Sequence, residues 1–235
     1  MKVDITVAHP ALITIFKNQN IPIFVDTNLF IPPDRSKLNG IPIRFEEYKD
    51  FWLDALFDCF TTLSIHESVY DELVKKDVIS YVDEKLNSSP KLLTIYYDKD
   101  LNEIEKQMFS TYLKSVSKFS AYDPERDSRR DRAEVRSLAF MAVKEFVYFA
   151  TNDDLPRRLI ECAEKLNTGL DNMIFLSFYN LIYFLHKKNC YDNSKLRMLY
   201  KNLYFLTSSE KNNNPNWDTF IKGMDKLYYS YITYS

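Results

Sequence analysis

Residues 21–33 read IPIFVDTNLFIPP, a short apolar run that stops at a carboxylate. The residues up to Val25 favour a buried β-strand, and Asp26, Thr27 and Asn28 follow it directly. A charge at the end of a buried strand is costly unless something pairs with it. Asp26 is therefore either the cap of a strand-to-helix turn or a group that faces a cation.

The length of the chain suits one large domain or a domain with extensions. Of the 235 residues, 46% are hydrophobic and 15% are aromatic, which is ample for a core, while the formal net charge is −2. A nucleic-acid partner would therefore need a local basic patch. The chain has 3 glycines and neither a GxGxxG nor a GxxxxGK[ST] motif, which disfavours nucleotide cradles of those kinds.

Cysteine use and hydropathy indicate a reducing compartment. Cys59, Cys162 and Cys190 are scattered without a CxxC pair, which argues against a structural zinc site. The N-terminal segment does not resemble a signal peptide, and no apolar run is long enough to span a bilayer. We therefore expect a cytoplasmic protein without a membrane partner.

Strand-like and helix-like segments alternate along the chain. β-branched and aromatic residues predict strands at 22–27, 61–65, 145–153 and 172–176. Helical spacing of apolar residues predicts helices at 10–19, 46–60, 66–76, 101–119, 132–144, 155–166, 177–188, 194–205 and 217–232. Such alternation predicts an α/β/α sandwich with a central, mostly parallel sheet, plus extra helices at the end of the chain.

Acidic side chains fall at the ends of these elements. Asp26 ends the first strand, and Asp153 and Asp154 end the strand FVYFATNDD. Ligands of open parallel sheets bind at the carboxyl ends of strands. Glu72 lies in the helix after LSI, and Glu134 lies in the first turn of a later helix. Acids without His or Cys partners are typical ligands of Mg²⁺ or Mn²⁺, so we predict a metal site that includes all five, with Asp154 as ligand or helix cap.

Glu67 competes with Glu72 for a place in this site. Ser64 lies three residues before Glu67, which is the spacing of a capping box at the start of a helix. We therefore assign Glu67 to the helix start and Glu72 to the site.

The order of these motifs resembles the PIN-domain ribonuclease family. The strand end VDTN, the helix segment SVYDEL, the segment DRAEVRSLAFMA and the strand end VYFATNDD follow in that order, and TGLDNMIFL is similar to the family's last strand. The resemblance spans roughly residues 21–190. Matched residue by residue, it implies that Asp26, Glu72, Glu134 and Asp153 are catalytic and hold Mg²⁺ or Mn²⁺. It implies a metal-dependent endoribonuclease that hydrolyses RNA phosphodiester bonds.

The chain exceeds a minimal member of that family. We expect residues 1–20 to form an N-terminal extension packed on the domain, 21–190 to form the PIN-like catalytic domain, and 191–235 to form a C-terminal helical extension. A helical insertion is expected around 77–125. The alternatives to a nuclease are a non-catalytic PIN-like scaffold that binds RNA or protein, and a component of a toxin or defence system.

Each acid also has an ordinary structural interpretation. Asp26 and Asp153 suit helix caps, and Glu134 suits the first turn because of the helix dipole. Glu72 alone would be a solvated helix residue. Taken singly these interpretations are preferred, but the occurrence of all four acids in one order favours a shared site.

Basic residues precede Glu134 in the segment ERDSRRDR. The candidates for contacts with RNA phosphates are Arg129, Arg130 and Arg132. Arginine is suited to bidentate phosphate contacts, whereas Asp127 and Asp131 could instead neutralise a solvated loop. Asn28 could orient a water or the substrate, or serve as a turn residue. We expect RNA, single-stranded or structured, as substrate, and leave a homo-oligomer or a regulatory protein partner open.

Overall fold

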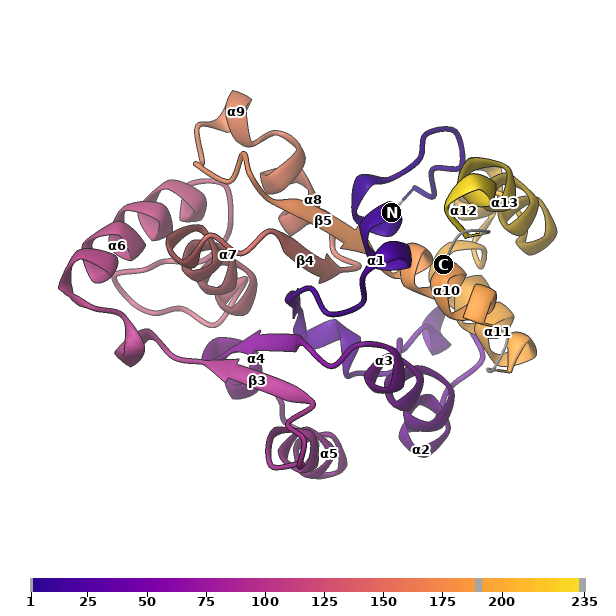
Figure 1. Ribbon diagram of the computed structural model, residues 1–235, viewed down its shortest axis with the longest axis horizontal. Coiled ribbons are helices and arrows are strands. Elements are labelled where there is room, and N and C mark those ends of the chain that lie inside the picture. The colour runs from indigo at the N-terminus through magenta and orange to yellow at the C-terminus, as the bar shows by residue number, and fades with distance from the viewer. Residues whose placement is uncertain (1, 189–191, 233–235) are drawn as a thin grey trace. The chain divides into compact units, whose positions relative to one another are not determined.

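The computed structural model describes residues 2–188 and 192–232, and the chain forms two compact units (Figure 1). The first unit comprises residues 1–21, 31–60 and 176–235, and the second comprises 22–30 and 61–175. Both units therefore combine segments that are distant in the sequence. Cys162 is a free thiol, and Cys190 lies outside the described residues.

A sheet of five parallel strands confirms the predicted α/β class, with helices flanking it. The strands are β1 (Ile23–Val25), β2 (Leu63–His66), β3 (Leu93–Tyr96), β4 (Tyr148–Thr151) and β5 (Ile174–Ser177), in the order β3-β2-β1-β4-β5. In the middle of the sheet, Phe24 is in register with Ser64 on one side and Phe149 on the other.

The strand β1 lies where the strand order reverses. From β1 the chain proceeds to β2 and β3 on one side, and it then crosses to β4 on the other. The crevice outside the carboxyl ends of such strands is the usual ligand position in an open parallel sheet. Because β1 ends at Val25 and β4 at Thr151, the predicted acids after each strand leave the sheet at this crevice.

The second unit holds most of the sheet and a set of helices around it. These helices are α4 (Glu67–Asp71), α5 (Lys76–Leu86), α6 (Glu103–Ser117), α7 (Arg132–Lys144), α8 (Asp154–Glu161) and α9 (Ala163–Leu166). Phe24, Phe140 and Phe149 are fully buried in its core. The bounds of α7 equal those predicted, because its apolar positions recur at helical spacing and pack on this core.

The segment 77–125, predicted to be a helical insertion, also contributes the strand β3. Residues 92–97 read LLTIYY, which is rich in the β-branched and aromatic residues that favour strands. The run is short and is followed by the stronger helical pattern of residues 101–119, so the sequence analysis did not predict this strand. As a consequence Asp98, which follows β3 directly, was not considered among the acids at the carboxyl edge of the sheet.

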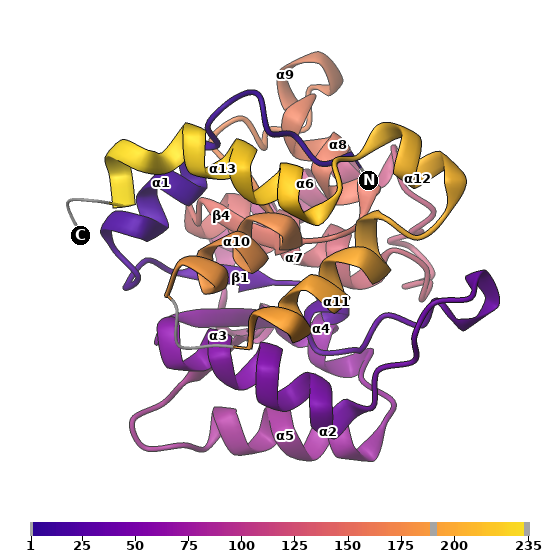
Figure 2. The ribbon, with the colours of Figure 1, turned by 90° about the vertical axis from the view of Figure 1, so that its right-hand side faces the viewer.

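The first unit is helical. Its helices are α1 (Pro10–Lys17), α2 (Phe45–Tyr48), α3 (Asp54–Cys59), α10 (Phe178–Lys188), α11 (Asn193–Tyr204), α12 (Ser208–Asn213) and α13 (Trp217–Ile232), several of which are labelled in Figure 2. Its core is aromatic: the rings of Tyr200 and Phe220 stack 4.5 Å apart, and those of Phe16 and Phe184 lie 5.3 Å apart. Residues 178–185, within the predicted helix 177–188, are buried in this core.

Two features of the first unit bear on the predictions. The helix α12 lies in the polar stretch 208–216 and is not among the predicted helices. Among the described helices, none combines the length and the hydropathy needed to cross a bilayer. The predicted boundaries of the PIN-like domain, at residues 20 and 190, stay a prediction. Residue 190 lies outside the described part of the chain.

Candidate metal centre

Asp26 is buried at the end of β1 and is held by hydrogen bonds on both carboxylate oxygens. The residue is 1% exposed. Its Oδ1 accepts from the N–H of Thr27 at 2.7 Å, and its Oδ2 accepts from the Thr151 hydroxyl at 2.9 Å. Asp26 thereby caps the short 3₁₀ helix η1 (Thr27–Leu29). The cap and the cation-facing interpretations are therefore compatible, because a carboxylate oxygen can accept a further ligand.

Thr151 connects Asp26 to Asp153. Its hydroxyl donates to Asp26 and accepts from the N–H of Asp153 at 3.0 Å. The Asp153 Oδ2 accepts from the Asn28 side-chain amide at 2.9 Å, and the side chain makes no capping bond with α8. The residues after β1 and those after β4 therefore hold one another in place.

Glu134 reaches the same place from the first turn of α7. One carboxylate oxygen from each of Asp26, Glu134 and Asp153 lies within 4.8 Å of the other two. We call these residues the three-carboxylate group. Asp131, the residue directly before α7, has a φ of 57°. This left-handed conformation directs the chain from the loop 118–131 into α7.

The electrostatics of the three-carboxylate group oppose full ionisation. Burial raises the pKa of Asp26 well above its ordinary value, and the charges of Glu134 and Asp153 raise it further. Burial, together with the charges of Glu72, Asp153 and Asp131, raises the pKa of Glu134 to about 7. Burial also raises the pKa of Asp153, against the bond from Asn28.

The donor set fits a hard divalent cation. All three groups offer carboxylate oxygens, and the charges that raise their pKa values come from other acids. Close carboxylates cannot all ionise without a cation, whereas a bound divalent cation would compensate the charge. This α/β protein therefore has a buried acidic cluster that could bind a metal ion.

Glu72 lies beside the three-carboxylate group rather than within it. Its Oε2 accepts from the Thr27 hydroxyl at 3.0 Å, and its Oε1 accepts from the N–H of Ala133 at 3.2 Å. Glu72 therefore connects the residue after Asp26 to the residue before Glu134. This arrangement positions both acids, and it differs from the ligand role predicted for Glu72.

Asp154 also lies outside the group. Its carboxylate pairs with Arg157 at 3.0 Å and is 67% exposed, so its position does not match the predicted ligand role. Asp131, which the sequence suggests as a partner of the arginines, instead accepts from the N–H of Ala121 at 2.7 Å. Its charge acts on the three-carboxylate group, a contribution that the sequence analysis missed.

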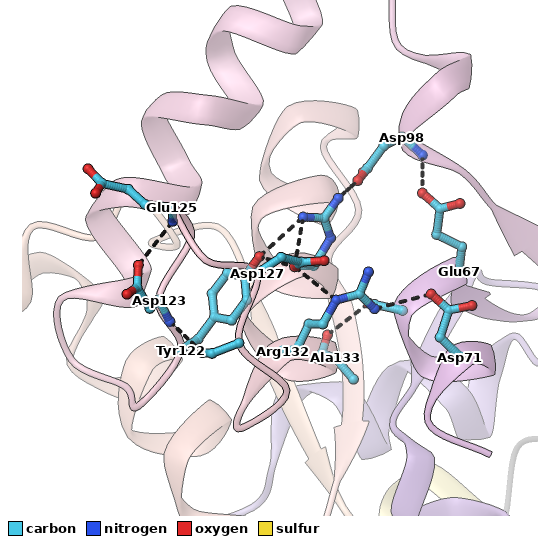
Figure 3. Close-up of polar contacts among 12 residues, drawn as sticks. Glu67, Asp71, Asp98, Tyr122, Asp123, Glu125, Asp127, Arg132 and Ala133 are labelled. Carbon is cyan, nitrogen blue, oxygen red and sulfur yellow. Dashed lines mark hydrogen bonds and ion pairs between the residues drawn. The ribbon is translucent and has the colours of Figure 1, made fainter. Parts of the chain in front are cut away.

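The predicted phosphate-binding arginines divide into two kinds. Arg132 binds Asp127 at 2.9 Å and Asp71 at 3.1 Å (Figure 3), so it joins the loop 118–131 to α4 and is not free for RNA. Arg129 and Arg130 are exposed. Within the described chain, no ion pair of theirs is found. Only this pair remains available as predicted.

A second polar cluster lies at the ends of β2 and β3. His66 Nδ1 accepts from the N–H of Ser68 at 3.3 Å and lies 2.7 Å from its hydroxyl. The proton is therefore assigned to Nε2, which lies 2.9 Å from Asp98 and donates to it. Arg136 binds the other Asp98 oxygen. We call His66, Ser68, Asp98 and Arg136 the His66 cluster.

The His66 cluster corrects one expectation. The capping box of Ser64 and Glu67 is not formed: His66 caps α4, and Glu67 instead accepts from the N–H of Asp98 at 2.9 Å (Figure 3). The fold also connects Ser68 and Asp98 through the two ring nitrogens of His66. Recognition of β3 in the sequence would have revealed Asp98.

This second cluster is a structural network. His66 and Ser68 are fully buried, and the His66 ring lies 5.1 Å from that of Phe140. Burial raises the pKa of Asp98, but bonds and charges from His66 and Arg136 outweigh it and leave this pKa below its usual value. The carboxylate is therefore already compensated, and the cluster ties β2, β3 and α7 together.

Comparisons with known proteins identify no relative. No family model matches the chain, and no curated protein or solved structure matches it at a significant level. The site is therefore interpreted from its own geometry.

The raised carboxyl pKa values predict that the metal-free protein loses stability as the pH rises. The folded three-carboxylate group retains protons that the unfolded chain has released. For Glu134 this stabilisation is complete below the ordinary carboxyl pKa, about 4, and is lost as the pH rises through about 7. For Asp26 it is lost as the pH rises through a pKa that is also raised. Asp26→Asn removes the strongest source of this loss while retaining an oxygen acceptor for Thr27.

Thermal unfolding in EDTA tests this account. Wild type and Asp26→Asn should have similar stabilities near pH 4, and the variant should be more stable near pH 8, by about 1.4 kcal/mol per unit of the Asp26 shift. The comparison of the two proteins cancels the titration of distant groups. A variant that is less stable at both pH values would show that Asp26 is chiefly a structural cap.

Asp98→Asn should lower the stability of the protein without affecting metal binding. The change leaves Arg136 with Asp127, 3.7 Å away, as its remaining acidic partner, and removing one member of a largely buried ion pair costs about 3 kcal/mol. Glu103→Gln is the matched control, because Glu103 pairs with Lys106 on an exposed face at 2.8 Å. Urea unfolding measures the difference, and equal stability of the two variants would contradict a structural role of the His66 cluster.

Proposed function

We propose that this protein is a metal-dependent nuclease that hydrolyses the phosphodiester bonds of RNA. The observation that carries this proposal is the approach of three carboxylates to within 4.8 Å of one another at the reversal point of a parallel sheet. Oxygen ligands of this kind suit Mg²⁺ or Mn²⁺. The resemblance of the motif order to the PIN-domain family supports RNA as the substrate.

The proposed roles follow from the contacts. Asp26, Glu134 and Asp153 would hold the cation. A bound Mg²⁺ or Mn²⁺ supplies a water molecule of lowered pKa and stabilises charge that develops on a phosphate. Thr151 keeps Asp26 oriented through its hydroxyl. Glu72 sets the distance between η1 and α7 through its two hydrogen bonds.

Arg129 and Arg130 are the proposed substrate contacts in the second compact unit. They precede α7 in the loop 118–131 and are exposed. The loop is tied down by Arg132, which pairs with Asp127 and Asp71. An anchored loop with two free guanidinium groups suits phosphate binding. These contacts would add affinity without taking part in the chemical step.

Cleavage of a labelled RNA in Mg²⁺ or Mn²⁺ tests the proposed activity through graded variants. Wild type should cleave, and EDTA should abolish cleavage. Thr151→Val, which removes only the hydroxyl that orients Asp26, should lower kcat about 10–100-fold, as is typical for partners of metal ligands. Asp26→Asn should lower it further. Asp154→Asn is the control, because Asp154 lies outside the three-carboxylate group, and it should retain activity.

Two results from the variants would contradict the proposed site. One is unchanged cleavage by Asp26→Asn. The other is an equal loss in Asp26→Asn and Asp154→Asn, which would indicate a general effect of charge. RNA binding without cleavage by wild type, at any tested concentration of either metal, would favour a non-catalytic RNA-binding scaffold.

Arg129→Ala combined with Arg130→Ala should raise the KM for RNA and leave kcat nearly unchanged. Uniform binding that is lost from the ground and transition states alike raises KM alone. Cleavage rates over a range of RNA concentrations separate the two constants. A fall in kcat at unchanged KM would mean instead that one of these arginines acts on the transition state.

A further inference from the structure

A groove with a cavity volume of about 500 Å³ opens on the first compact unit. Its walls come from α11, from α12 and from the loop around Ile41. The side chains that matter for its chemistry are Ile41, Arg197, Met198, Lys201, Phe205 and Lys211. The volume lies within the range of sites that bind small ligands or parts of larger ones.

The walls of the groove are held together by buried polar contacts. Asn202 is 2% exposed, accepts from the N–H of Ile41 at 3.3 Å and donates to its carbonyl at 2.8 Å. Next to Ile41, Gly40 approaches Arg35 so closely that a Cβ atom would lie 2.6 Å from the Arg35 Cβ. The loop is therefore fixed against α11, and the groove does not need a ligand to form it.

The charge of the groove is one-sided. Arg197, Lys201 and Lys211 line it and are exposed, and no acidic residue of the described chain is among its lining. Glu210 precedes Lys211 in the sequence, but its Oε1 pairs with Arg35 at 2.6 Å and its Oε2 accepts from the N–H of Thr207 at 2.9 Å. The nearest acid in sequence is thus already engaged, and no ion pair of the three cations occurs within the described residues.

We propose that this groove binds a single-stranded segment of nucleic acid. The phosphates would contact Arg197, Lys201 and Lys211, and a base would lie against Phe205. The choice of RNA as the nucleic acid rests on the proposed function, whereas the phosphate contacts rest on the groove alone. In a chain whose formal net charge is −2, such a local patch is required for any attraction to a polyanion.

The combination of side chains favours nucleic acid over an acidic peptide. Arg197 and Lys201 are four residues apart on α11, so they lie on one face of the helix. Met198, Phe205 and Ile41 line the same groove, and Ile41 is 61% exposed. Cations beside an aromatic ring and apolar side chains are typical of grooves that track a single strand, because every base has a face that can stack.

Fluorescence anisotropy with a short labelled RNA tests the proposal without cleavage. The protein carries Asp26→Asn and is kept in EDTA, so binding is measured apart from catalysis. The test variant adds Arg197→Ala and Lys201→Ala. The matched control adds Lys222→Ala and Lys226→Ala, which remove two exposed charges at the same spacing from α13 of the same unit. Thermal unfolding checks that both proteins remain folded.

The groove variant should bind RNA more weakly and with a smaller dependence on salt. Each lost phosphate contact on a single strand lowers the slope of log K against log salt by about 0.7, so two lost contacts lower it by about 1.4. If the binding curves converge at 1 M salt, this slope corresponds to about 25-fold weaker binding at 0.1 M salt. The control should bind as the parent does. A DNA of the same sequence shows whether the sugar contributes.

Several outcomes would overturn the proposal. One is an unchanged salt slope in the groove variant, and another is an equal loss of RNA binding in the groove variant and the control. A third is displacement of RNA by polyglutamate of matched charge, which would indicate that the groove binds an acidic peptide. The result is independent of the nuclease test. Groove-dependent binding by a wild-type protein that never cleaves would contradict the nuclease alone, and cleavage with groove-independent binding would contradict the groove alone.

Discussion

The burial of the Asp26 carboxylate between the ends of β1 and β4 is the constraint on which the candidate metal centre depends. The Thr151 hydroxyl bonds to this carboxylate and also to the backbone of Asp153, so one side chain fixes two of the three acids. A buried carboxylate beside two others is unfavourable without a cation. The metal-free fold is therefore destabilised locally by repulsion among the three carboxylates. Local destabilisation of this kind is common at functional sites.

The sequence was sufficient where a local pattern and the packing agreed. The helix α7 was predictable because its apolar residues recur at helical spacing. The strands β1 and β4 were predictable because they are rich in β-branched and aromatic residues, and with these elements came Glu134, Asp26 and Asp153. The sequence was insufficient where tertiary contacts determine the role of a side chain. Whether Glu72 faces a cation or Thr27, and whether Arg132 binds RNA or Asp71, depends on which segments meet after folding. Asp98 was missed because the short strand β3 precedes a longer helical pattern.

An acidic centre repels the polyanion on which it is proposed to act, so binding energy has to come from elsewhere on the chain. The structure offers exposed cations in both compact units. Arg129 and Arg130 precede α7 in one, and the groove of α11 and α12 lies in the other.

The central claim is that the three carboxylates hold a divalent cation. Anomalous diffraction from crystals of the protein grown with Mn²⁺ measures this directly, because manganese can be located at its absorption edge. The account predicts a peak about 2.0–2.6 Å from carboxylate oxygens of Asp26, Glu134 and Asp153. A peak only at His66, Glu67 and Asp98, or no ordered peak at saturating Mn²⁺, would contradict it.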